Sequence, residues 1–193
     1  LRLKPDYAEA LNNQGIVFRE LGKLTEAVDC YRKAVSLQSD YAAAHSNLGL
    51  ALDDLGDYTG ALESFHNALA ISPNYAEVHY NLGTTLQTLG RLSEAVESFE
   101  SALKLNPTIS QAHTNLGLAL RDLGKFEEAK NSYEAALTID PGLAEARHNL
   151  GILQLLLGNF EDGWKNYGWR WRMRKLGSRN RSVKDGARSH ERS

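Results

Sequence analysis

The chain has 193 residues and a formal net charge of −2, from 22 lysines and arginines against 24 aspartates and glutamates. This balance excludes a protein that binds nucleic acid through its overall charge. The single cysteine, Cys30, excludes an internal disulfide framework and a multi-cysteine zinc site. No apolar run reaches the roughly 20 residues of a membrane span or resembles a signal peptide, so we expect a cytoplasmic protein with no membrane partner.

Self-comparison of the sequence reveals a period of 34 residues, counted from Ala8. Residues 1–7 match the end of such a unit and are interpreted as the remainder of a truncated preceding repeat. Four regular repeats follow at 8–41, 42–75, 76–109 and 110–143, and a divergent terminal repeat occupies 144–176. Residues 177–193 are basic, lack the period and are predicted to form a disordered tail.

Each repeat is predicted to form a helical hairpin. Residues that could cap the first helices with a side chain are Asp6, Asp40, Asn74 and Thr108, with Gly142 as the weakest member. The fifteenth position is always glycine, where a positive φ is expected to end the first helix: Gly22, Gly56, Gly90, Gly124 and Gly158. The second helix is predicted over about residues 24–37 and their equivalents, and prolines end it: Pro73, Pro107 and Pro141.

Two further positions recur inside the hairpins. The eighth is glycine: Gly15, Gly49, Gly83, Gly117 and Gly151. The twenty-fourth is aromatic: Tyr31, Phe65, Phe99, Tyr133 and Tyr167. Glycine inside a helix costs about 1 kcal/mol relative to alanine, so we expect a steric reason for it, namely the close approach of one helix backbone to the next.

The terminal repeat departs from this pattern. It contains all three tryptophans, Trp164, Trp169 and Trp171, and residues 164–193 hold ten lysines and arginines against two acidic residues. One interpretation is that these aromatic side chains cover an exposed edge of the core. A basic tail of this kind is more typical of a solvated segment than of a nucleic-acid site.

These recurring small, aromatic and proline positions resemble the tetratricopeptide repeat (TPR) family over nearly the whole chain. The resemblance implies an all-α fold, a right-handed superhelical solenoid of helix-turn-helix repeats with an inner concave groove. One repeat cannot bury its own apolar face, so stability comes from its neighbours. Residues from Phe160 to Arg170 also look like the terminal repeat of bacterial TPR proteins that continue into a glycosyltransferase domain.

Two neighbouring stripes run along the first helix. The stripe at positions three, seven, ten and fourteen is predicted to be core, as in Ala44, Leu48, Ala51 and Leu55, with Gln14 as its odd member. In TPR proteins the stripe at positions two, six, nine and thirteen faces the groove. Its sixth position is asparagine in every repeat: Asn13, Asn47, Asn81, Asn115 and Asn149.

Helix propensity does not explain this column, because asparagine is a poor helix former. A primary amide can donate and accept hydrogen bonds, so one asparagine per repeat could hold the backbone of an extended peptide. The column looks like the asparagine ladder of O-linked N-acetylglucosamine transferases, which holds protein substrates in this way. The alternative is an asparagine that bonds only within the solenoid.

The same stripe is acidic and aliphatic, and it supplies the other predicted peptide contacts: Asp54, Glu77, Thr84 and Asp122. Such a surface disfavours the TPR class that clamps an acidic C-terminus with basic side chains. It fits a neutral to basic extended polypeptide by charge.

No catalytic, cofactor or metal site is predicted. His45, His79 and His113 share one position but lie one repeat apart, so they are expected to pack between repeats and not to meet at one ion. The sequence therefore favours a non-enzymatic protein-interaction module. Two alternatives stay open: the substrate-recruiting arm of a glycosyltransferase whose catalytic domain is absent, and a self-associating scaffold.

Overall fold

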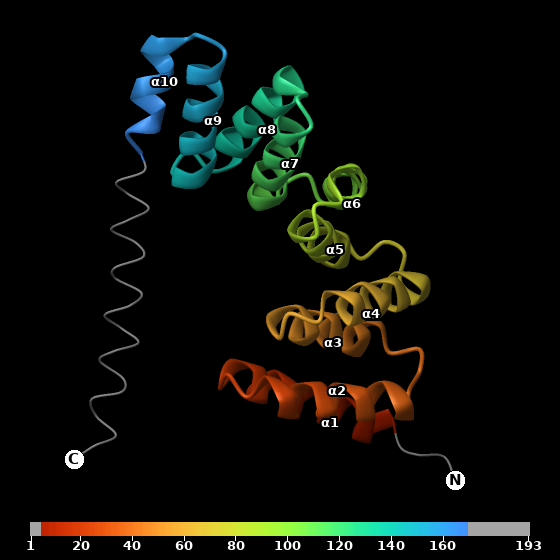
Figure 1. The fold of residues 1–193 in the computed structure, drawn as a ribbon. Helices are drawn as coiled ribbons and strands as arrows, with labels where there is room; N and C mark the ends of the chain where they lie inside the picture. Colours follow the sequence, from red (N-terminus) through yellow and green to blue (C-terminus); the bar gives the residue numbers. More distant parts are fainter. Residues whose placement is uncertain (1–4, 170–193) are drawn as a thin grey trace, which may run out of the picture. The chain divides into compact units, whose positions relative to one another are not determined.

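The computed structural model describes residues 5–169, with side chains from residue 7 onward, and within this range it contains ten helices and no strand. The prediction of an all-α fold built from helical hairpins is confirmed (Figure 1). The helices are α1 (Pro5–Glu20), α2 (Leu24–Leu37), α3 (Ala42–Asp54), α4 (Tyr58–Ile71), α5 (Ala76–Thr88), α6 (Leu92–Leu105), α7 (Ser110–Asp122), α8 (Phe126–Ile139), α9 (Ala144–Leu156) and α10 (Phe160–Tyr167). Trp171 and the predicted tail lie outside the described residues.

The chain divides into two compact units, an N-terminal unit (Leu1–Pro107) with α1–α6 and a C-terminal unit (Thr108–Ser193) with α7–α10. In both, each first helix packs against the second helix of its own hairpin, as α1 does against α2 and α7 against α8. Neighbouring hairpins also stack, through α2 with α3 and α4 with α5 in the N-terminal unit and α8 with α9 in the C-terminal unit. First helices of adjacent hairpins touch as well, so each unit presents a continuous first-helix side.

A glycine with positive φ ends each first helix, as predicted. Gly22 has a φ of 73° and Gly56 a φ of 82°, and the φ angles of Gly90, Gly124 and Gly158 are 72°, 77° and 81°. L-residues rarely adopt this region. The chain therefore reverses after the first helix without strain and enters the second helix within a few residues.

The glycines inside the first helices make room for a ring and not, in most repeats, for a backbone. A Cβ on Gly49 would stand 2.6 Å from Cε1 of Phe65, and one on Gly83 would stand 2.7 Å from Cε1 of Phe99. The expectation of two backbones in contact is therefore wrong for the first four repeats. It holds for the terminal repeat, where the nearest atom to such a Cβ on Gly151 is the backbone nitrogen of Tyr167.

The predicted caps of the first helices are wrong. Asp6 lies inside α1, and the helices α3, α5, α7 and α9 begin after Tyr41, Tyr75, Ile109 and Leu143, none of which caps with its side chain. The expected caps Asp40, Asn74, Thr108 and Gly142 stand one residue earlier than these positions. Tyr41 is half-buried and packs against a core cluster that contains Ala34 and Ala44.

Side-chain caps occur on second helices instead. Asp57 accepts a hydrogen bond from the backbone N–H of Gly60 at 3.0 Å, and Asn159 accepts one from Asp162 at 3.4 Å. These caps satisfy backbone donors at the starts of α4 and α10 that have no partner within the helix.

The predicted core stripe is buried except at its last position. Ala44 and Ala51 are completely buried and Leu48 is 7% exposed, whereas Leu55 is 47% exposed. In α1 the equivalent residues are all exposed, contrary to the prediction: Ala10, Gln14, Val17 and Leu21. The core therefore lies between successive hairpins.

Candidate peptide-binding face

The candidate site is the first-helix face, defined by the predicted groove stripe and considered separately in each unit. In the N-terminal unit it comprises Glu9, Asn13, Ile16 and Glu20 on α1, Ala43, Asn47, Leu50 and Asp54 on α3, and Glu77, Asn81, Thr84 and Thr88 on α5. In the C-terminal unit it comprises Gln111, Asn115, Leu118 and Asp122 on α7 and Glu145, Asn149, Ile152 and Leu156 on α9. Apart from Asn149, these side chains are exposed or half-buried.

The five asparagines differ in burial. Asn13 is exposed, Asn47, Asn81 and Asn115 are half-buried, and Asn149 is only 9% exposed. A shared position in the repeat therefore does not give a shared environment. The amides that a ligand could reach most readily in the N-terminal unit are those of Asn13 and Asn81.

Asn47 is tied to the neighbouring helix. Its Nδ2 donates a hydrogen bond to Oδ1 of Asn12 at 2.9 Å, which links α3 to α1. Asn12 is 4% exposed, so this bond also satisfies a buried carbonyl. Because a primary amide has two N–H donors and one acceptor oxygen, Asn47 keeps one donor and its carbonyl oxygen for another partner.

Asn13 and Asn81 make no side-chain hydrogen bond to any residue between 5 and 169. Beside Asn81, the hydroxyl of Thr84 donates to the backbone carbonyl of Tyr80 at 3.1 Å, so its proton is directed into its own helix. Thr84 can therefore act toward a ligand only as an acceptor. The hydroxyl of Thr88 likewise donates to the carbonyl of Thr84, so within the groove stripe of α5 it is Asn81 that can donate to a peptide carbonyl.

The face is acidic, but two of its carboxylates are already paired. Asp54 binds Arg19 at 2.7 Å across α1 and α3, and Asp122 binds Arg121 at 2.7 Å. Glu77 and Glu145 are exposed and form no ion pair with a described residue. Exposed pairs of this kind contribute little to stability, and they leave the face with a smaller negative charge than its composition indicates.

A further side-chain hydrogen bond joins α3 to the next first helix, α5. Thr85, which is 1% exposed, donates its hydroxyl proton to Oδ1 of Asp53 at 2.6 Å. Together with the Asn47–Asn12 and Arg19–Asp54 contacts, it connects the first helices of the N-terminal unit through polar side chains. The period of the sequence did not predict these links, because each joins residues at different positions of adjacent repeats.

The side chains at the histidine position bond to the loop that precedes their hairpin, and we call this contact the latch. Nε2 of His45 lies 3.1 Å from the carbonyl oxygen of Ser39, and Nε2 of His79 lies 2.9 Å from that of Pro73, six residues earlier in both cases. Arg147 stands at the same position of the terminal repeat and donates to the carbonyl of Pro141 at 2.8 Å. No described group of three histidine, cysteine or acidic residues could hold a metal ion.

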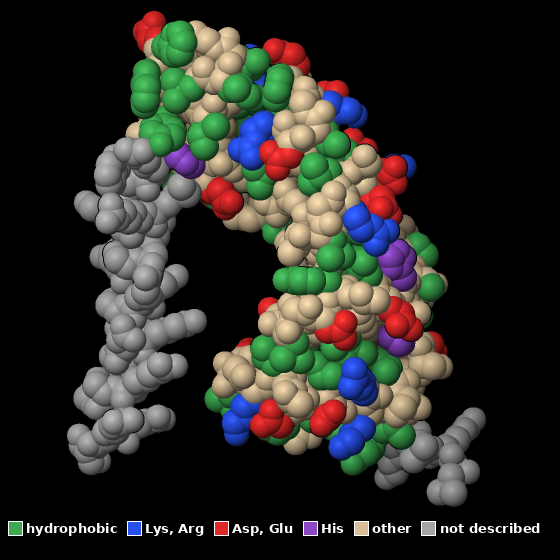
Figure 2. Space-filling view, viewed as in Figure 1, with side chains coloured by type: hydrophobic (Ala, Val, Ile, Leu, Met, Phe, Trp, Pro, Cys, Tyr) green, Lys and Arg blue, Asp and Glu red, His purple; other side chains and the backbone are tan. Residues whose placement is uncertain are grey.

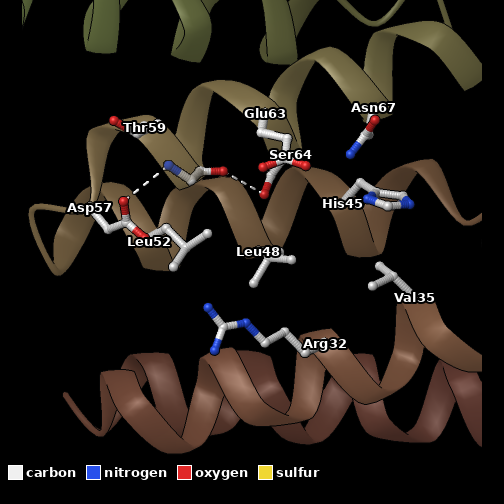
Figure 3. A pocket seen from close by; sticks show the side chains of 11 residues that line it. Arg32, Val35, His45, Leu48, Leu52, Asp57, Thr59, Glu63, Ser64 and Asn67 are labelled. Carbon is white, nitrogen blue, oxygen red and sulfur yellow. Dashed lines mark hydrogen bonds between the residues drawn. The ribbon is translucent and has the colours of Figure 1, made fainter.

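A hollow lies in the N-terminal unit between α2, α3 and α4, with a volume of about 440 Å³ (Figure 3). Val35, Leu48 and Leu52 form its apolar floor, and Arg32 extends into it from α2. Gly60 stands where the other repeats carry an acidic residue: Glu26, Glu94, Glu128 and Asp162.

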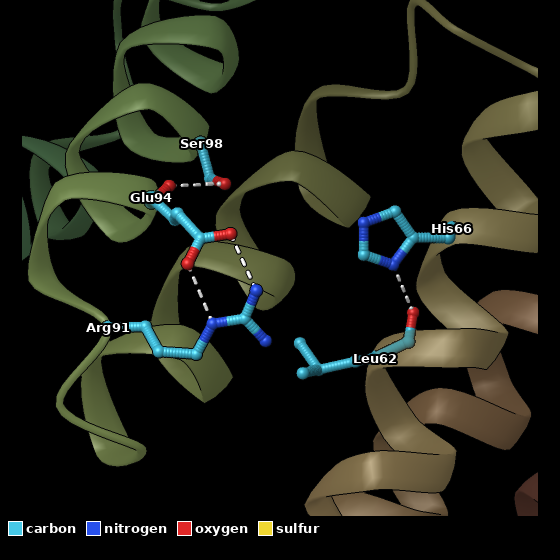
Figure 4. A network of polar contacts seen from close by, with 5 residues as sticks. All are labelled: Leu62, His66, Arg91, Glu94 and Ser98. Carbon is cyan, nitrogen blue, oxygen red and sulfur yellow. Dashed lines mark hydrogen bonds and ion pairs between the residues drawn. The ribbon is translucent and has the colours of Figure 1, made fainter.

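The equivalent place in the next repeat lies between α4 and α6. Arg91 and Glu94 form a two-bond ion pair at 2.7 and 2.6 Å, and His66 lies across from them (Figure 4). The hydrogen bonds from Arg91 and, to a smaller extent, the charge of His66 lower the pKa of the Glu94 carboxyl.

Some aromatic residues of the terminal repeat contact α9, whereas another is exposed. The guanidinium of Arg147 lies 4.6 Å from the ring centre of Trp169, and the ring of Tyr167 lies 5.0 Å from that of His148. Trp164 stacks edge-on against Tyr167 at 5.7 Å but is 62% exposed. Tyr167 and Trp169 therefore cover α9, whereas Trp164 covers little.

Family comparisons agree with this architecture. A TPR repeat model matches residues 15–54, and tetratricopeptide repeat models match residues 40–108 and residues 80–144 and 114–163. No curated protein matches the chain. None of the described helices is long and apolar enough to cross a membrane.

Several solved structures are similar. YrrB, described as a TPR protein with an unusual peptide-binding site, is 26% identical with a TM-score of 0.71, and the match covers 82% of both chains. MamA from Desulfovibrio magneticus RS-1 is 20% identical with a TM-score of 0.80, covering 89% of this chain and 97% of its own. PilF from Pseudomonas aeruginosa is 23% identical with a TM-score of 0.77, covering 85% and 75% respectively.

Proposed function

The chain is a tetratricopeptide repeat protein, and we propose that it is an interaction module whose first-helix face binds an extended polypeptide through main-chain hydrogen bonds. TPR domains serve as protein-interaction modules, and one similar structure is described as having a peptide-binding site. The observation that carries the proposal is the state of Asn81. Its amide is half-buried on α5 and has no partner among the described side chains and backbone groups.

The spacing of the amides suits a peptide backbone. Helices pack about 8–10 Å apart, and an extended chain advances about 3.3 Å per residue. Amides on α1, α3 and α5 could therefore each bond roughly every third residue of a ligand. Asn13 and Asn81 would supply complete amides, and Asn47 would supply the donor and the oxygen that its bond to Asn12 leaves.

Charge and apolar contacts would add selectivity. Glu77 stands one turn from Asn81 on α5, and Leu50 lies beside Asn47 on the same stripe of α3. A peptide with small or aliphatic side chains and a basic residue opposite Glu77 would satisfy both. In the C-terminal unit Asn115, Asp122 and Glu145 would serve similar contacts, whereas Asn149 is too deeply buried to lead the binding.

The test uses a display library of random unstructured decapeptides, from which the tightest binder is taken for fluorescence polarisation. Asn81→Ala is expected to weaken binding about tenfold, since one charge-independent amide contact is worth roughly 1–1.5 kcal/mol. Asn131→Ala, an exposed asparagine on α8, is the matched control. Equal affinity of Asn81→Ala and the wild type, with unchanged helicity of both variants, would contradict the proposal.

A second candidate is the substrate-recruiting arm of a protein O-GlcNAc-type glycosyltransferase. It rests on the terminal run from Phe160 to Arg170, which is similar to the repeat that precedes the catalytic domain in bacterial proteins of that kind. The coding sequence beyond Ser193 decides it. A glycosyltransferase domain there would make the bound peptide a substrate, and any other continuation would leave the binding module alone.

A further inference from the structure

The hollow between α2, α3 and α4 combines an apolar floor with charged walls. Leu48 and Leu52 of α3 form the floor together with Val35 of α2. Its volume of about 440 Å³ is in the range of small-molecule sites. The helices with which these three pack, α1 and α5, are also described, so the hollow does not lie at an end of the described array.

The two walls carry opposite charges that do not pair with each other (Figure 3). Arg32 extends from α2 and has no hydrogen bond or ion pair with a described residue, and the same is true of Glu63 on α4. Asp57 precedes α4; its Oδ1 accepts the backbone N–H of Gly60, and its Oδ2 has no described partner. On the visible face of the N-terminal unit, hydrophobic side chains lie beside both basic and acidic ones (Figure 2). A cation on one wall and carboxylates on the other are therefore available to a ligand.

Gly60 leaves space between the floor and the acidic wall. A Cβ added there would stand 2.6 Å from Oδ2 of Asp57 and 3.1 Å from Cδ1 of Leu52. Any larger residue would therefore take up space beside both the apolar floor and the carboxylate oxygen that has no partner.

We propose that this hollow binds a free α-amino acid with an apolar side chain. The carboxylate would accept two parallel hydrogen bonds from the guanidinium of Arg32, and the ammonium group would bind Glu63 and Oδ2 of Asp57. The side chain would then lie on Leu48 and Leu52, where its burial removes apolar surface from water. A ligand with only one of the two charges would leave one wall unpaired, whereas a zwitterion satisfies both.

A hollow at the equivalent place of the C-terminal unit has different chemistry. It lies between α8, α9 and α10 and has a volume of about 220 Å³. Glu134 takes the place of Arg32, and Gln154 takes the place of Leu52. Lys130 is the one cation among its described lining residues, and it stands among three acidic residues. We therefore expect no amino acid to bind there, and this hollow serves as an internal control.

The experiment titrates L-leucine into the isotopically labelled full 193-residue chain and follows the backbone amide shifts. Saturable shifts are expected on α2, α3 and α4 and not around the hollow of the C-terminal unit. Isocaproate, which is leucine without its ammonium group, and isoamylamine, which lacks the carboxylate, are each expected to bind about tenfold more weakly. N-acetyl-leucinamide carries neither charge, and binding as tight as that of leucine would overturn the proposal in favour of a purely apolar pocket.

Two variants test the walls separately. Arg32→Gln is expected to weaken leucine binding about tenfold without weakening that of isoamylamine. Glu63→Gln is expected to weaken leucine binding without weakening that of isocaproate. Lys33→Gln on α2 and Glu100→Gln on α6 change exposed residues that do not line the hollow, and these controls should bind leucine as the wild type does.

The absence of saturable shifts with leucine, shifts confined to other helices, or wild-type affinity of Arg32→Gln for leucine would each overturn the proposal. The inference is independent of peptide binding, because no residue of the first-helix face lines the hollow. Its failure would therefore leave the proposed peptide site untouched, and failure of the peptide site would leave this one.

Discussion

The ring of Phe99 lies directly over Gly83, so that a Cβ added to this glycine would stand 2.7 Å from Cε1 of the ring. Real Cβ atoms do not approach a ring so closely. Phe99 is completely buried and cannot move aside without disturbing the hairpin of α5 and α6. The contact explains why a residue that weakens helices stands inside α5.

Gly83→Ala is therefore expected to destabilise the protein although alanine is the better helix former. Propensity would gain about 1 kcal/mol, whereas overpacking costs about 1–3 kcal/mol, so a net loss of up to about 2 kcal/mol should appear in urea unfolding followed by circular dichroism. Gly168→Ala is the control, since its Cβ would meet no atom closer than 3.6 Å.

The same contact predicts coupling between the two positions. In a Phe99→Leu background the ring is gone, so Gly83→Ala should cost less than it does in the wild type. Additive losses in the double variant would show that the glycine is required for another reason.

Thr85→Val is expected to cost about 1–3 kcal/mol, because it removes the donor to the half-buried carboxylate of Asp53 while keeping the shape of the side chain. Thr114→Val is the matched control. Thr114 is 2% exposed and donates only to the carbonyl of Ser110 in its own helix. Equal losses for the two variants would mean that the link between α3 and α5 adds nothing.

Tyr133→Phe is expected to raise stability by about 1 kcal/mol. The hydroxyl of Tyr133 is buried and has no hydrogen-bond partner among the described residues, and such a group costs free energy when it leaves water. Phe65 and Phe99 already occupy the same position in other repeats. The reciprocal change, Phe99→Tyr, should lower the urea midpoint, and a gain there would contradict this account.

Alkaline pH should destabilise the protein through two tyrosines. Burial raises the pKa of Tyr31 to about 12 and that of Tyr133 to about 12, compared with about 10 in an unfolded chain. The folded state thus holds these protons more tightly. The stability they contribute is complete below about pH 10 and is lost as the pH rises toward 12.

This pH dependence is measurable as the urea midpoint against pH. The double variant with Tyr31→Phe and Tyr133→Phe retains the lysines and the exposed tyrosines, so it controls for their titration. Its urea midpoint should fall less steeply than that of the wild type between about pH 10 and pH 12. Parallel curves would show that the two hydroxyls do not titrate later than ordinary tyrosines.

The period of the sequence was sufficient to predict the hairpins, because glycine at the turn and an aromatic over a helical glycine are local steric requirements. It was not sufficient for the helix caps. α3 begins after Tyr41, a half-buried residue that packs against the core and does not cap with its side chain, and not after the polar residue Asp40 that the sequence indicated.

The asparagine column shows a second limit of periodic reasoning. Asn47 finds Asn12 beside it, whereas the residue equivalent to Asn12 in the next repeat is Ser46, and so Asn81 has no such neighbour. Identical residues at one position therefore meet different surroundings.

The latch formed by His45, His79 and Arg147 limits where residues can be inserted into the chain or deleted from it. Each side chain reaches the carbonyl six residues before it, and both imidazole and guanidinium groups make this contact. The donor is thus exchangeable, but inserting or deleting one residue between Pro73 and His79 would carry the acceptor away from it. We therefore expect the loop between two hairpins to tolerate a substitution of the donor but not the insertion of a residue.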